Sequence, residues 1–372
     1  MTGSIAIVIE SFGGGGAQHV ASTLANHWVE HGKHVTAITF SKPESDVFTL
    51  DPRVRRMSVE GAGVSGNPLI GTFANAARIR DIRVAIRASG ADTVLSFVGS
   101  MNVLAILAAL GLGTRVIISE RNDPARQSLG RLWDALRRLL YRRADLVVAN
   151  SRAAIETMRS YVPSERLLWL PNPLRRAGET SPAIATLKPF FLAAGRLDVQ
   201  KAYDSLLKAF AEVAYGRGDV ELVVLGSGPL RQALETQADE LGISNRVIFM
   251  GRVDDPFPFY RAAIAFVHPA RFEGLPNAVL EAMSEGLPPI ISDAQEGLRG
   301  IVQEGQSGLV VPVGAVGALS GAMNRLLNEP QLRSHLSAGA RQSVETELSG
   351  AIDKWTEAVC PDVMVKPFSA AS

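Results

Sequence analysis

The sequence has a single cysteine, Cys360, in 372 residues. One thiol cannot form an internal disulfide, so we expect a fold held together by hydrophobic packing in a reducing compartment. An excess of charge of either sign is also missing, because 38 lysines and arginines balance 37 aspartates and glutamates. This near-neutral balance argues against nucleic acid as a partner.

Long hydrophobic runs are absent as well. The longest, Val103–Leu112, is too short to span a bilayer as a helix. The N-terminus leads directly into the apolar segment Ile5–Ile9 with no basic residue ahead of it, which indicates a buried strand rather than a signal peptide. We therefore expect a cytoplasmic protein that can still lie on the inner face of a membrane.

Short apolar runs alternate instead with helical patterns. In the first half we predict the strands Ile5–Ile9, Val35–Phe40, Thr93–Phe97, Val116–Ser119 and Leu146–Ala149, and the helices Ala17–His31, Ile79–Ser89, Asn102–Leu110 and Leu129–Arg142. After the linker Leu170–Leu174, the predicted strands are Phe190–Ala194, Val220–Leu225, Val247–Met250, Ala265–His268, Pro289–Ser292 and Gly308–Val311. This order predicts an α/β protein with two doubly wound, largely parallel sheets whose strand ends bind ligand in a crevice.

The most informative stretch places one carboxylate before a turn and a second on the helix that follows. It reads Arg271-Phe272-Glu273-Gly274-Leu275-Pro276-Asn277-Ala278-Val279-Leu280-Glu281-Ala282-Met283. Gly274 permits a backbone geometry that a side chain would forbid, and Pro276 suits the first position of a helix. The N-terminus of such a helix attracts phosphate, while Glu273 and Glu281 can accept hydrogen bonds from sugar hydroxyls. These features describe a nucleotide-sugar site; the alternative is an ordinary loop and helix with both carboxylates in water.

This stretch resembles the Glu-x7-Glu signature of the retaining glycosyltransferases of the GT-B fold, glycosyltransferase family 4 (group 1). The resemblance implies that Glu273 contacts the donor sugar and that Glu281 holds the ribose. It also implies that the donor diphosphate lies against the turn made by Gly274, Leu275, Pro276 and Asn277.

Two cations follow the first strand of the second domain, in Gly195-Arg196-Leu197-Asp198-Val199-Gln200-Lys201. Arginine and lysine can bind phosphate and stabilise the negative charge that develops on a leaving diphosphate, although a solvated basic loop is the alternative. The segment resembles the family's Gly-Arg-Leu-x-x-x-Lys-Gly element, which implies catalytic roles for Arg196 and Lys201. Ala202 replaces the usual glycine, and we expect it only to stiffen the loop.

Gly13-Gly14-Gly15-Gly16-Ala17-Gln18 follows the first strand, where glycines let the backbone approach a ligand. A nicotinamide site is disfavoured because the second strand does not end in a carboxylate, and a plain flexible turn is the other alternative. The segment resembles the family's Gly-Gly-Ala-Glu loop. This implies that Gly15 and Gly16 face the donor diphosphate and that Gln18, in place of the usual glutamate, lies on the acceptor side.

Other strand ends carry weaker resemblances. Gly226-Ser227-Gly228-Pro229 and Gly251-Arg252-Val253 look like turns that line the base pocket in related transferases, so Gly226, Arg252 and Val253 are donor-binding candidates. Ordinary strand-to-helix turns are the alternative. Ser119-Glu120-Arg121 looks like the Ser-Glu-His element of relatives that extend lipid-linked oligosaccharides. We therefore expect Glu120 and Arg121 on the acceptor side, with a surface arginine as the alternative.

Two further patterns concern metals and membranes. His27 and His31 share a helix face, but no third ligand follows at a suitable spacing and no Asp-x-Asp element occurs, so we predict no cofactor and no tightly bound metal. Basic residues gather in two helical stretches, which suits an anionic membrane surface, although a core-facing helix with a charged outer face is the alternative. They are Arg131, Arg137, Arg138, Arg142 and Arg143, and Arg78, Arg80, Arg83 and Arg87.

With the resemblance, the sequence predicts a retaining hexosyltransferase with a nucleotide-sugar donor, UDP by default. Its acceptor is a glycan, polyprenyl-diphosphate-linked by default or else soluble, of exopolysaccharide or surface-glycan synthesis. The resemblance assigns the acceptor to a Rossmann-like domain at residues 1–170 and the donor to a second at 171–349. Residues 350–372 then hold a helix that crosses back to the first domain, and a tail. The alternatives are a GT-B nucleotide-sugar epimerase and a non-catalytic nucleotide-sugar-binding subunit.

Overall fold

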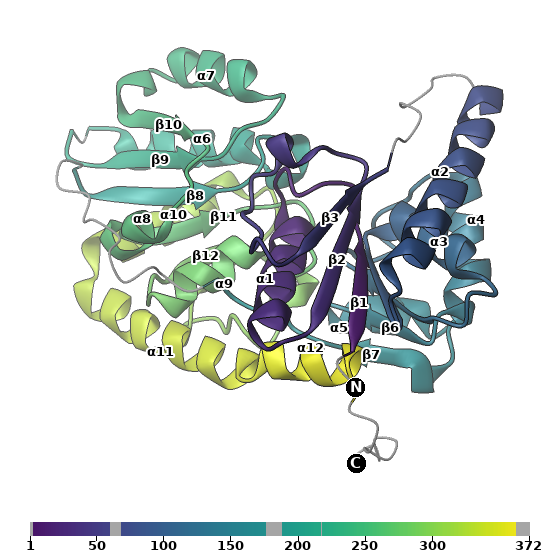
Figure 1. The fold of residues 1–372 in the computed structure, drawn as a ribbon. Helices are drawn as coiled ribbons and strands as arrows, with labels where there is room; N and C mark the ends of the chain where they lie inside the picture. Colours follow the sequence, from purple (N-terminus) through teal and green to yellow (C-terminus); the bar gives the residue numbers. More distant parts are fainter. Residues whose placement is uncertain (1–2, 60–67, 176–187, 217, 362–372) are drawn as a thin grey trace. The chain divides into compact units, whose positions relative to one another are not determined.

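The computed structural model describes residues 3–59, 68–175, 188–216 and 218–361. The chain divides into two compact units (Figure 1). Unit 1 comprises residues 1–173 together with 350–372, and unit 2 comprises residues 174–349. The expected tail, at residues 366–372, lies outside the described residues.

Unit 1 is built on a seven-stranded parallel sheet with the order β3-β2-β1-β4-β5-β6-β7. Its strands are β1 (Ser4–Val8), β2 (His34–Thr39), β3 (Arg55–Ser58), β4 (Thr93–Phe97), β5 (Arg115–Glu120), β6 (Leu146–Ala149) and β7 (Leu167–Trp169). The central strands are mostly apolar and are buried on both faces, as is typical of a parallel sheet covered on two sides. The strand order runs outward in both directions from β1 and β4, which is the doubly wound arrangement that the alternation predicted.

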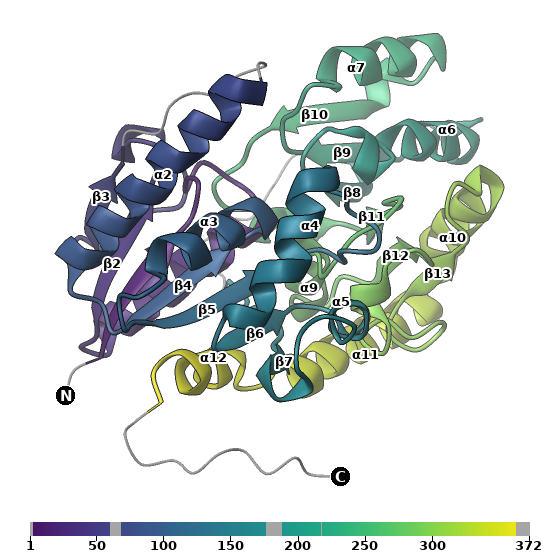
Figure 2. The ribbon, with the colours of Figure 1, turned by 90° about the vertical axis from the view of Figure 1, so that its right-hand side faces the viewer.

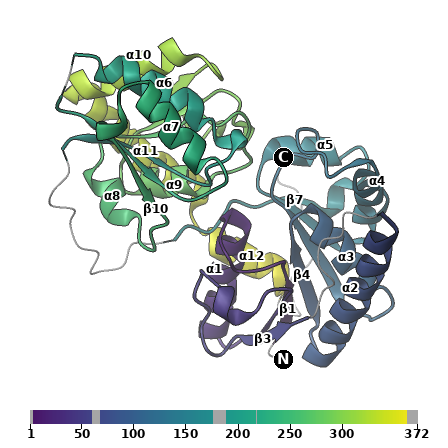
Figure 3. The ribbon, with the colours of Figure 1, turned by 90° about the horizontal axis from the view of Figure 1, so that it is seen from above.

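Helices cover both faces of this sheet (Figure 3). One face packs against α1 (Gly16–Glu30) and α12 (Ala351–Val359), and the other against α2 (Pro68–Ser89), α3 (Gly99–Ala109), α4 (Arg131–Leu140) and α5 (Arg152–Met158). Figure 2 shows α2, α3 and α4 over the same side of the sheet. Helix α12 is fixed by Trp355, which is fully buried, stacks on Phe97 and donates from Nε1 to the carbonyl oxygen of Pro171 at 2.8 Å.

Unit 2 repeats the plan with a six-stranded parallel sheet of order β10-β9-β8-β11-β12-β13. The strands are β8 (Phe190–Ala194), β9 (Glu221–Leu225), β10 (Val247–Gly251), β11 (Ala265–His268), β12 (Pro289–Ser292) and β13 (Leu309–Val311). One face packs against α6 (Tyr203–Ala214), α7 (Arg231–Glu240) and α10 (Val316–Asn328). The other packs against α8 (Phe257–Ala262), α9 (Asn277–Ser284) and α11 (Pro330–Leu348).

All the strands predicted from apolar runs are confirmed, with ends shifted by at most a residue. Two edge strands, β3 and β7, were missed because β3 reads Arg-Arg-Met-Ser without an apolar run and β7 has three residues. Because every strand of unit 2 is parallel, their carboxyl ends share one edge of the sheet. The segments that follow Ala194, Leu225, Gly251, His268 and Ser292 therefore begin at that edge.

Candidate functional site

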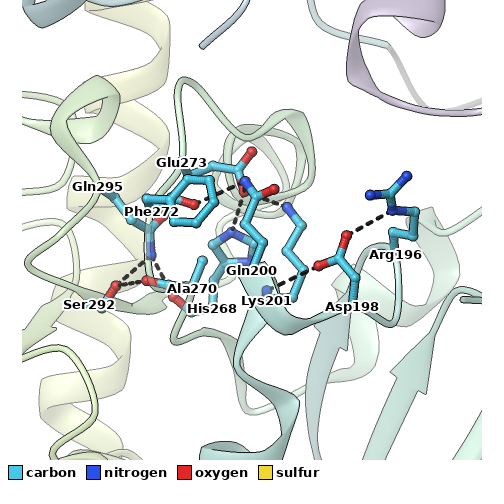
Figure 4. Close-up of polar contacts among 10 residues, drawn as sticks. All are labelled: Arg196, Asp198, Gln200, Lys201, His268, Ala270, Phe272, Glu273, Ser292 and Gln295. Carbon is cyan, nitrogen blue, oxygen red and sulfur yellow. Dashed lines mark hydrogen bonds and ion pairs between the residues drawn. The ribbon is translucent and has the colours of Figure 1, made fainter. Parts of the chain in front are cut away.

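The centre of the candidate site is the carboxylate of Glu273, on the loop between β11 and α9 (Figure 4). Lys201 Nζ lies 2.6 Å from Glu273 Oε2, and Gln200 Nε2 donates to the same oxygen at 3.2 Å. Among the described residues, no hydrogen bond reaches Oε1. The sequence placed Lys201 and Glu273 at two separate strand ends, and the fold brings them into direct contact.

Opposing influences act on the ionisation of Glu273. Burial by itself would raise the pKa of this carboxyl group, but the charge of Lys201 and the adjacent His268 outweigh burial and bring the pKa to about 2. Burial and the charge of Lys201 lower the pKa of His268, so its ring is neutral at pH 7. His268 Nε2 lies 3.8 Å from Glu273 Oε2. Glu273 is therefore an anion beside the amino group of Lys201 and a neutral imidazole.

The loop after β8 supplies both predicted cations. Lys201 ends a short 3-10 helix, Val199–Lys201, whose first turn is capped by Asp198. Arg196 is largely exposed and donates from Nε to Asp198 Oδ2 at 2.7 Å. Ala202 has φ of 55°, the left-handed region that favours glycine, so this replacement strains the backbone where we expected only a stiffer loop. Arg196 presents a guanidinium to solvent, whereas Lys201 is held against Glu273.

Two glycines let the loops after β8 and β9 touch. A Cβ on Gly226 would lie 1.9 Å from the carbonyl oxygen of Gly195, and one on Gly228 would lie 2.4 Å from the carbonyl oxygen of Leu197. Gly226 also has φ of 130°. The Gly-Ser-Gly turn is therefore required by backbone contact with the loop that carries Arg196, whatever else it binds.

Helix α9 begins at Asn277, one residue later than expected, so Pro276 precedes the helix as its cap. Gly274, Leu275 and Pro276 are buried. The α9 N-terminus therefore lies four residues past Glu273, and its end carries the partial positive charge of a helix dipole. Val253 packs against the apolar cluster on this face of the sheet, and Arg252 beside it is exposed.

Glu281, on α9, is buried and accepts a hydrogen bond from the hydroxyl of Tyr260 at 3.1 Å. Burial raises the pKa of Glu281 to about 7, because the hydrogen bond from Tyr260 and the charge of Arg175 offset burial only in part. The two carboxylates of the motif thus differ in character: Glu273 is ionised at every physiological pH, and Glu281 titrates near neutrality.

The candidates of unit 1 lie at its own strand ends. Gly15 and Gly16 are exposed at the start of α1, and Gln18 is the third residue of this helix. Gly15 has φ of 129°, and a Cβ there would lie 2.6 Å from Gln18 Oε1. This loop therefore has the exposed backbone and the glycine-specific geometry that the sequence suggested.

Glu120 and Arg121 are both buried at the end of β5. Glu120 Oε2 accepts from the hydroxyl of Tyr141 at 2.7 Å, and burial raises the pKa of Glu120. Arg121 Nη2 donates to the side-chain oxygen of Asn172, in the Pro171–Pro173 segment that leads out of unit 1. Arg121 is thus buried and hydrogen-bonded within unit 1, so the alternative of a surface arginine was wrong.

The basic stretch on α4 requires one correction. Arg137 was grouped with the outward-facing arginines, but it is buried, pairs with Asp134 at 2.9 Å and donates to the carbonyl oxygen of Pro124. Arg131, Arg138, Arg142 and Arg143 are exposed. Leu132 and Leu139 are also exposed, at 63% and 48%. None of the helices in the described part of the chain combines the length and the hydropathy that crossing a membrane requires.

The expectation for the two histidines on α1 also requires a correction. One ligand atom from each of His27, Glu30 and His31 lies within 4.8 Å of the others, so the expectation that no third ligand accompanies the histidines was wrong. His31 Nδ1 already lies 2.8 Å from the carbonyl oxygen of His27. The absence of a tightly bound metal stays a prediction.

Several residues around the site were not predicted. His268 and Ser292 each end a strand correctly predicted from its apolar run, and that position at the carboxyl edge of a parallel sheet was the available signal. Gln200, Tyr260 and Gln295 gave no such signal, because their roles depend on contacts with residues far away in sequence.

Two protein families match the chain, one over each of the two units. Residues 179–343 match the family described as "Glycosyl transferases group 1", and residues 15–173 match the one described as "Glycosyl transferase 4-like domain". Together the two matches span most of the chain.

Among curated proteins, two from Campylobacter jejuni are similar over most of both chains. One is an α-1,4-N-acetyl-D-galactosaminyltransferase named for a GalNAc-GalNAc-diNAcBac-PP-undecaprenol substrate; it is 28% identical, covering 95% of this chain and 98% of its own. The other, N-acetylgalactosamine-N,N'-diacetylbacillosaminyl-diphospho-undecaprenol 4-alpha-N-acetylgalactosaminyltransferase, is 26% identical, covering 88% and 91%.

Solved structures share the fold. Sucrose-phosphate synthase from Thermosynechococcus elongatus aligns with a TM-score of 0.80 at 18% identity, covering 96% of this chain and 98% of its own. The Anabaena protein HepE, in complex with UDP and glucose, aligns with a TM-score of 0.79 at 17% identity, covering 96% and 99%. The two Rossmann-like units thus have the GT-B architecture.

Proposed function

The chain belongs to the group 1 glycosyltransferases, and from this premise we propose that it transfers a hexosyl group from a nucleotide sugar to a glycan with retention of the anomeric configuration. The observation that carries the proposal is the contact between Lys201 and Glu273 at the carboxyl edge of the unit 2 sheet. It combines a fixed anion for sugar hydroxyls with a cation for phosphate, and α9 begins four residues beyond the anion.

In the proposed reaction, unit 2 binds the donor. Arg196, Lys201 and the turn at Gly274–Asn277 hold the diphosphate, whose negative charge grows as the glycosidic bond breaks. Glu273 accepts hydrogen bonds from the donor sugar, and Glu281 accepts them from the ribose. The acceptor hydroxyl attacks the anomeric carbon on the face that the diphosphate leaves, and a phosphate oxygen takes its proton. Because Glu273 is paired with Lys201, we assign it to orientation of the sugar and not to nucleophilic attack.

We propose a polyprenyl-diphosphate-linked glycan as the acceptor, bound by unit 1, and a UDP-sugar as the donor. Two relatives that cover nearly the whole chain carry diphospho-undecaprenol substrates in their names, which supports this acceptor. HepE, which shares the fold, was solved with UDP and glucose, which supports the choice of base. The product would then belong to surface-glycan or exopolysaccharide synthesis.

A lipid-linked acceptor needs an enzyme that works at a membrane surface, and we propose that the outer face of α4 meets the inner leaflet. Arg131, Arg138 and Arg142 are spaced along one side of the helix and its continuation, beside Leu132 and Leu139. Exposed leucines beside arginines suit the boundary between acyl chains and anionic headgroups. Arg137 is excluded from this face by its burial.

Co-sedimentation with liposomes tests this contact. We expect Arg138→Glu with Arg142→Glu to reduce binding to phosphatidylglycerol vesicles, because both charges face solvent. The matched control is Lys208→Glu with Arg325→Glu, two exposed cations of unit 2. Equal binding by the two double variants would contradict the proposed membrane face.

A transfer assay tests the function itself. Bacterial lipid extract is incubated with labelled UDP-, GDP- and ADP-sugars, and label in the lipid phase is measured for the wild type. Movement of label into lipid identifies the donor and supports the proposal. Interconversion of donor sugars without acceptor would favour an epimerase, and binding without turnover of any donor would favour a non-catalytic subunit. Proton NMR of the new glycosidic linkage then distinguishes retention from inversion.

A further inference from the structure

Two buried side chains at the end of β12 hydrogen-bond to the backbone that leads to Glu273. Ser292, the last residue of β12, donates from Oγ to the carbonyl oxygen of Ala270. Gln295 donates from Nε2 to the carbonyl oxygen of His268 at 2.6 Å and to Ser292 Oγ at 3.2 Å. Both hydrogens of the Gln295 amide are therefore used, and Figure 4 shows the arrangement.

These two side chains are among the most buried polar groups of unit 2. Ser292 is 1% exposed and Gln295 is 2% exposed. A buried hydrogen bond has no competition from water, and removing one partner leaves a buried carbonyl oxygen unsatisfied. The hydrogen bonds thus fix the backbone at residues 268 and 270, three to five residues before Glu273.

The same loop is also held from its other side. Gln200 donates to the carbonyl oxygen of Phe272 at 3.0 Å, and the backbone N–H of Arg271 donates to the carbonyl oxygen of Gln200 at 2.8 Å. The loop after β12 meets Gly274 as well, because a Cβ on Gly297 would lie 1.9 Å from the carbonyl oxygen of Gly274. Two strand ends, after β8 and after β12, therefore enclose the segment that presents Glu273.

The segments after β8 and after β12 make different contacts with the loop that carries Glu273. The segment after β8 carries Lys201, which contacts Glu273 directly. Ser292 and Gln295 make no hydrogen bond to Glu273, Lys201 or Arg196 among the described contacts. The hydrogen bonds described for their side chains go to the backbone of the loop and to each other, which is what a positioning role requires.

We propose that Ser292 and Gln295 are positioning residues, which set the place of the Glu273 carboxylate relative to the donor sugar through the backbone of residues 268–270. The inference rests on the proposed function, because it assigns these residues to the transfer step. Loss of either donor lets the loop shift, and a shift of about 1 Å at a reacting group can cost on the order of a hundredfold in rate. The diphosphate is also held by Arg196 and Lys201, to which Ser292 and Gln295 make no hydrogen bond, so nucleotide affinity falls less than the rate.

The variants are Ser292→Ala and Gln295→Met, which remove the donors, and Ser292→Thr, which keeps the hydroxyl. A purely structural role is controlled by Leu326→Ala, a fully buried residue of α10 in the cluster on the opposite face of the sheet. All four are compared at a temperature where each is folded, with the nucleotide sugar found in the donor panel as substrate. UDP alone is the probe for affinity.

We expect kcat to fall about tenfold to a hundredfold in Ser292→Ala and Gln295→Met, while the Kd for UDP changes much less than kcat. Ser292→Thr retains most of the kcat, and Leu326→Ala retains all of it at equal fraction folded. The inference is overturned if Ser292→Ala and Gln295→Met lose no more kcat than Leu326→Ala. It is equally overturned if their UDP affinity falls as much as their kcat.

Hydrogen exchange of the segment 270–275 separates this inference from the proposed function. Exchange of these amides should be faster in Ser292→Ala and Gln295→Met than in Leu326→Ala, whatever reaction the protein catalyses. If the wild type turns over no nucleotide sugar, the proposed function fails, and exchange still decides whether the two residues hold the loop. Equal exchange in all three variants overturns the positioning role.

Discussion

Lys201 Nζ lies 2.6 Å from Glu273 Oε2, and the two side chains retain 16% and 14% of their exposure. In such a partly shielded pair, the charge of Lys201 helps to keep Glu273 ionised, and removing one partner leaves an uncompensated charge. A donor diphosphate that reaches Lys201 would therefore place its sugar next to a carboxylate that is already oriented. The contact predicts that Lys201 and Glu273 act together in donor binding and transfer.

Replacement of Lys201 tests this directly. Lys201→Ala should lower kcat. The expected loss of transition-state stabilisation is about 2–4 kcal/mol, comparable to removing one donor from an oxyanion site. The expected measurement is turnover of the nucleotide sugar, with Lys208→Ala, an exposed lysine on α6, as the matched control. Unchanged turnover in Lys201→Ala would refute its role.

Nucleotide binding should depend on pH through Glu281. The pKa of this group is raised from 4.5 to about 7, so the folded protein binds more protons than the unfolded chain between these values and loses stability as pH rises through this window. Ribose hydroxyls donate to the ionised form, so we expect UDP affinity, measured by calorimetry, to increase between about pH 6 and pH 8. In Glu281→Gln this increase should shrink to whatever arises from UDP itself. The same pH dependence in both proteins would contradict the assignment.

Two glycine substitutions should have opposite effects on stability. Gly226→Ala places a Cβ 1.9 Å from the carbonyl oxygen of Gly195 at a φ of 130°. The backbone strain alone costs about 1–3 kcal/mol in the free energy of unfolding, and the collision adds to it. Gly321→Ala, in the exposed middle of α10 with open space around it, should stabilise by about 0.5–1 kcal/mol. Urea unfolding followed by circular dichroism measures both, and a stable Gly226→Ala protein would show that the two loops are not packed as described.

Arg121 and Asn172 should be coupled in stability. Asn172→Ala removes one hydrogen-bond partner of a buried guanidinium and should cost about 1–3 kcal/mol in the free energy of unfolding of unit 1. In an Arg121→Met background the same change should cost less, and the difference measures the contact. All four tryptophans lie in unit 1, so tryptophan fluorescence during urea unfolding reports on this unit. Additive effects of the two changes would mean that the contact contributes nothing.

The sequence was sufficient for the fold because parallel sheets impose local signals. Strands buried on both faces are mostly apolar, so runs such as Thr93–Phe97 and Ala265–His268 were recognisable from composition alone. Strands at the sheet edge escape this constraint, which is why β3 was not found. The turns after the strands stood out because glycine marks a close approach of backbones, as at Gly226.

Much of the site could not be predicted because it depends on contacts between strand ends that are distant in sequence. Tyr260 supports Glu281 from another helix, and Gln295 reaches the backbone of His268 from another strand end. The burial of Arg137 could not be predicted either. Its helix has basic residues on more than one side, and only the packing decides which side faces inward. Glu30 is different, because its spacing of three residues from His27 was visible and was overlooked.

The central claim is that Glu273 orients the sugar of a nucleotide-sugar donor for transfer. The most direct test is the rate of label transfer to lipid by Glu273→Gln, compared with the wild type and with Glu345→Gln, an exposed carboxylate of α11. We predict a loss of about a hundredfold in Glu273→Gln with UDP affinity retained, and no loss in Glu345→Gln. Transfer by Glu273→Gln at the wild-type rate would contradict the account.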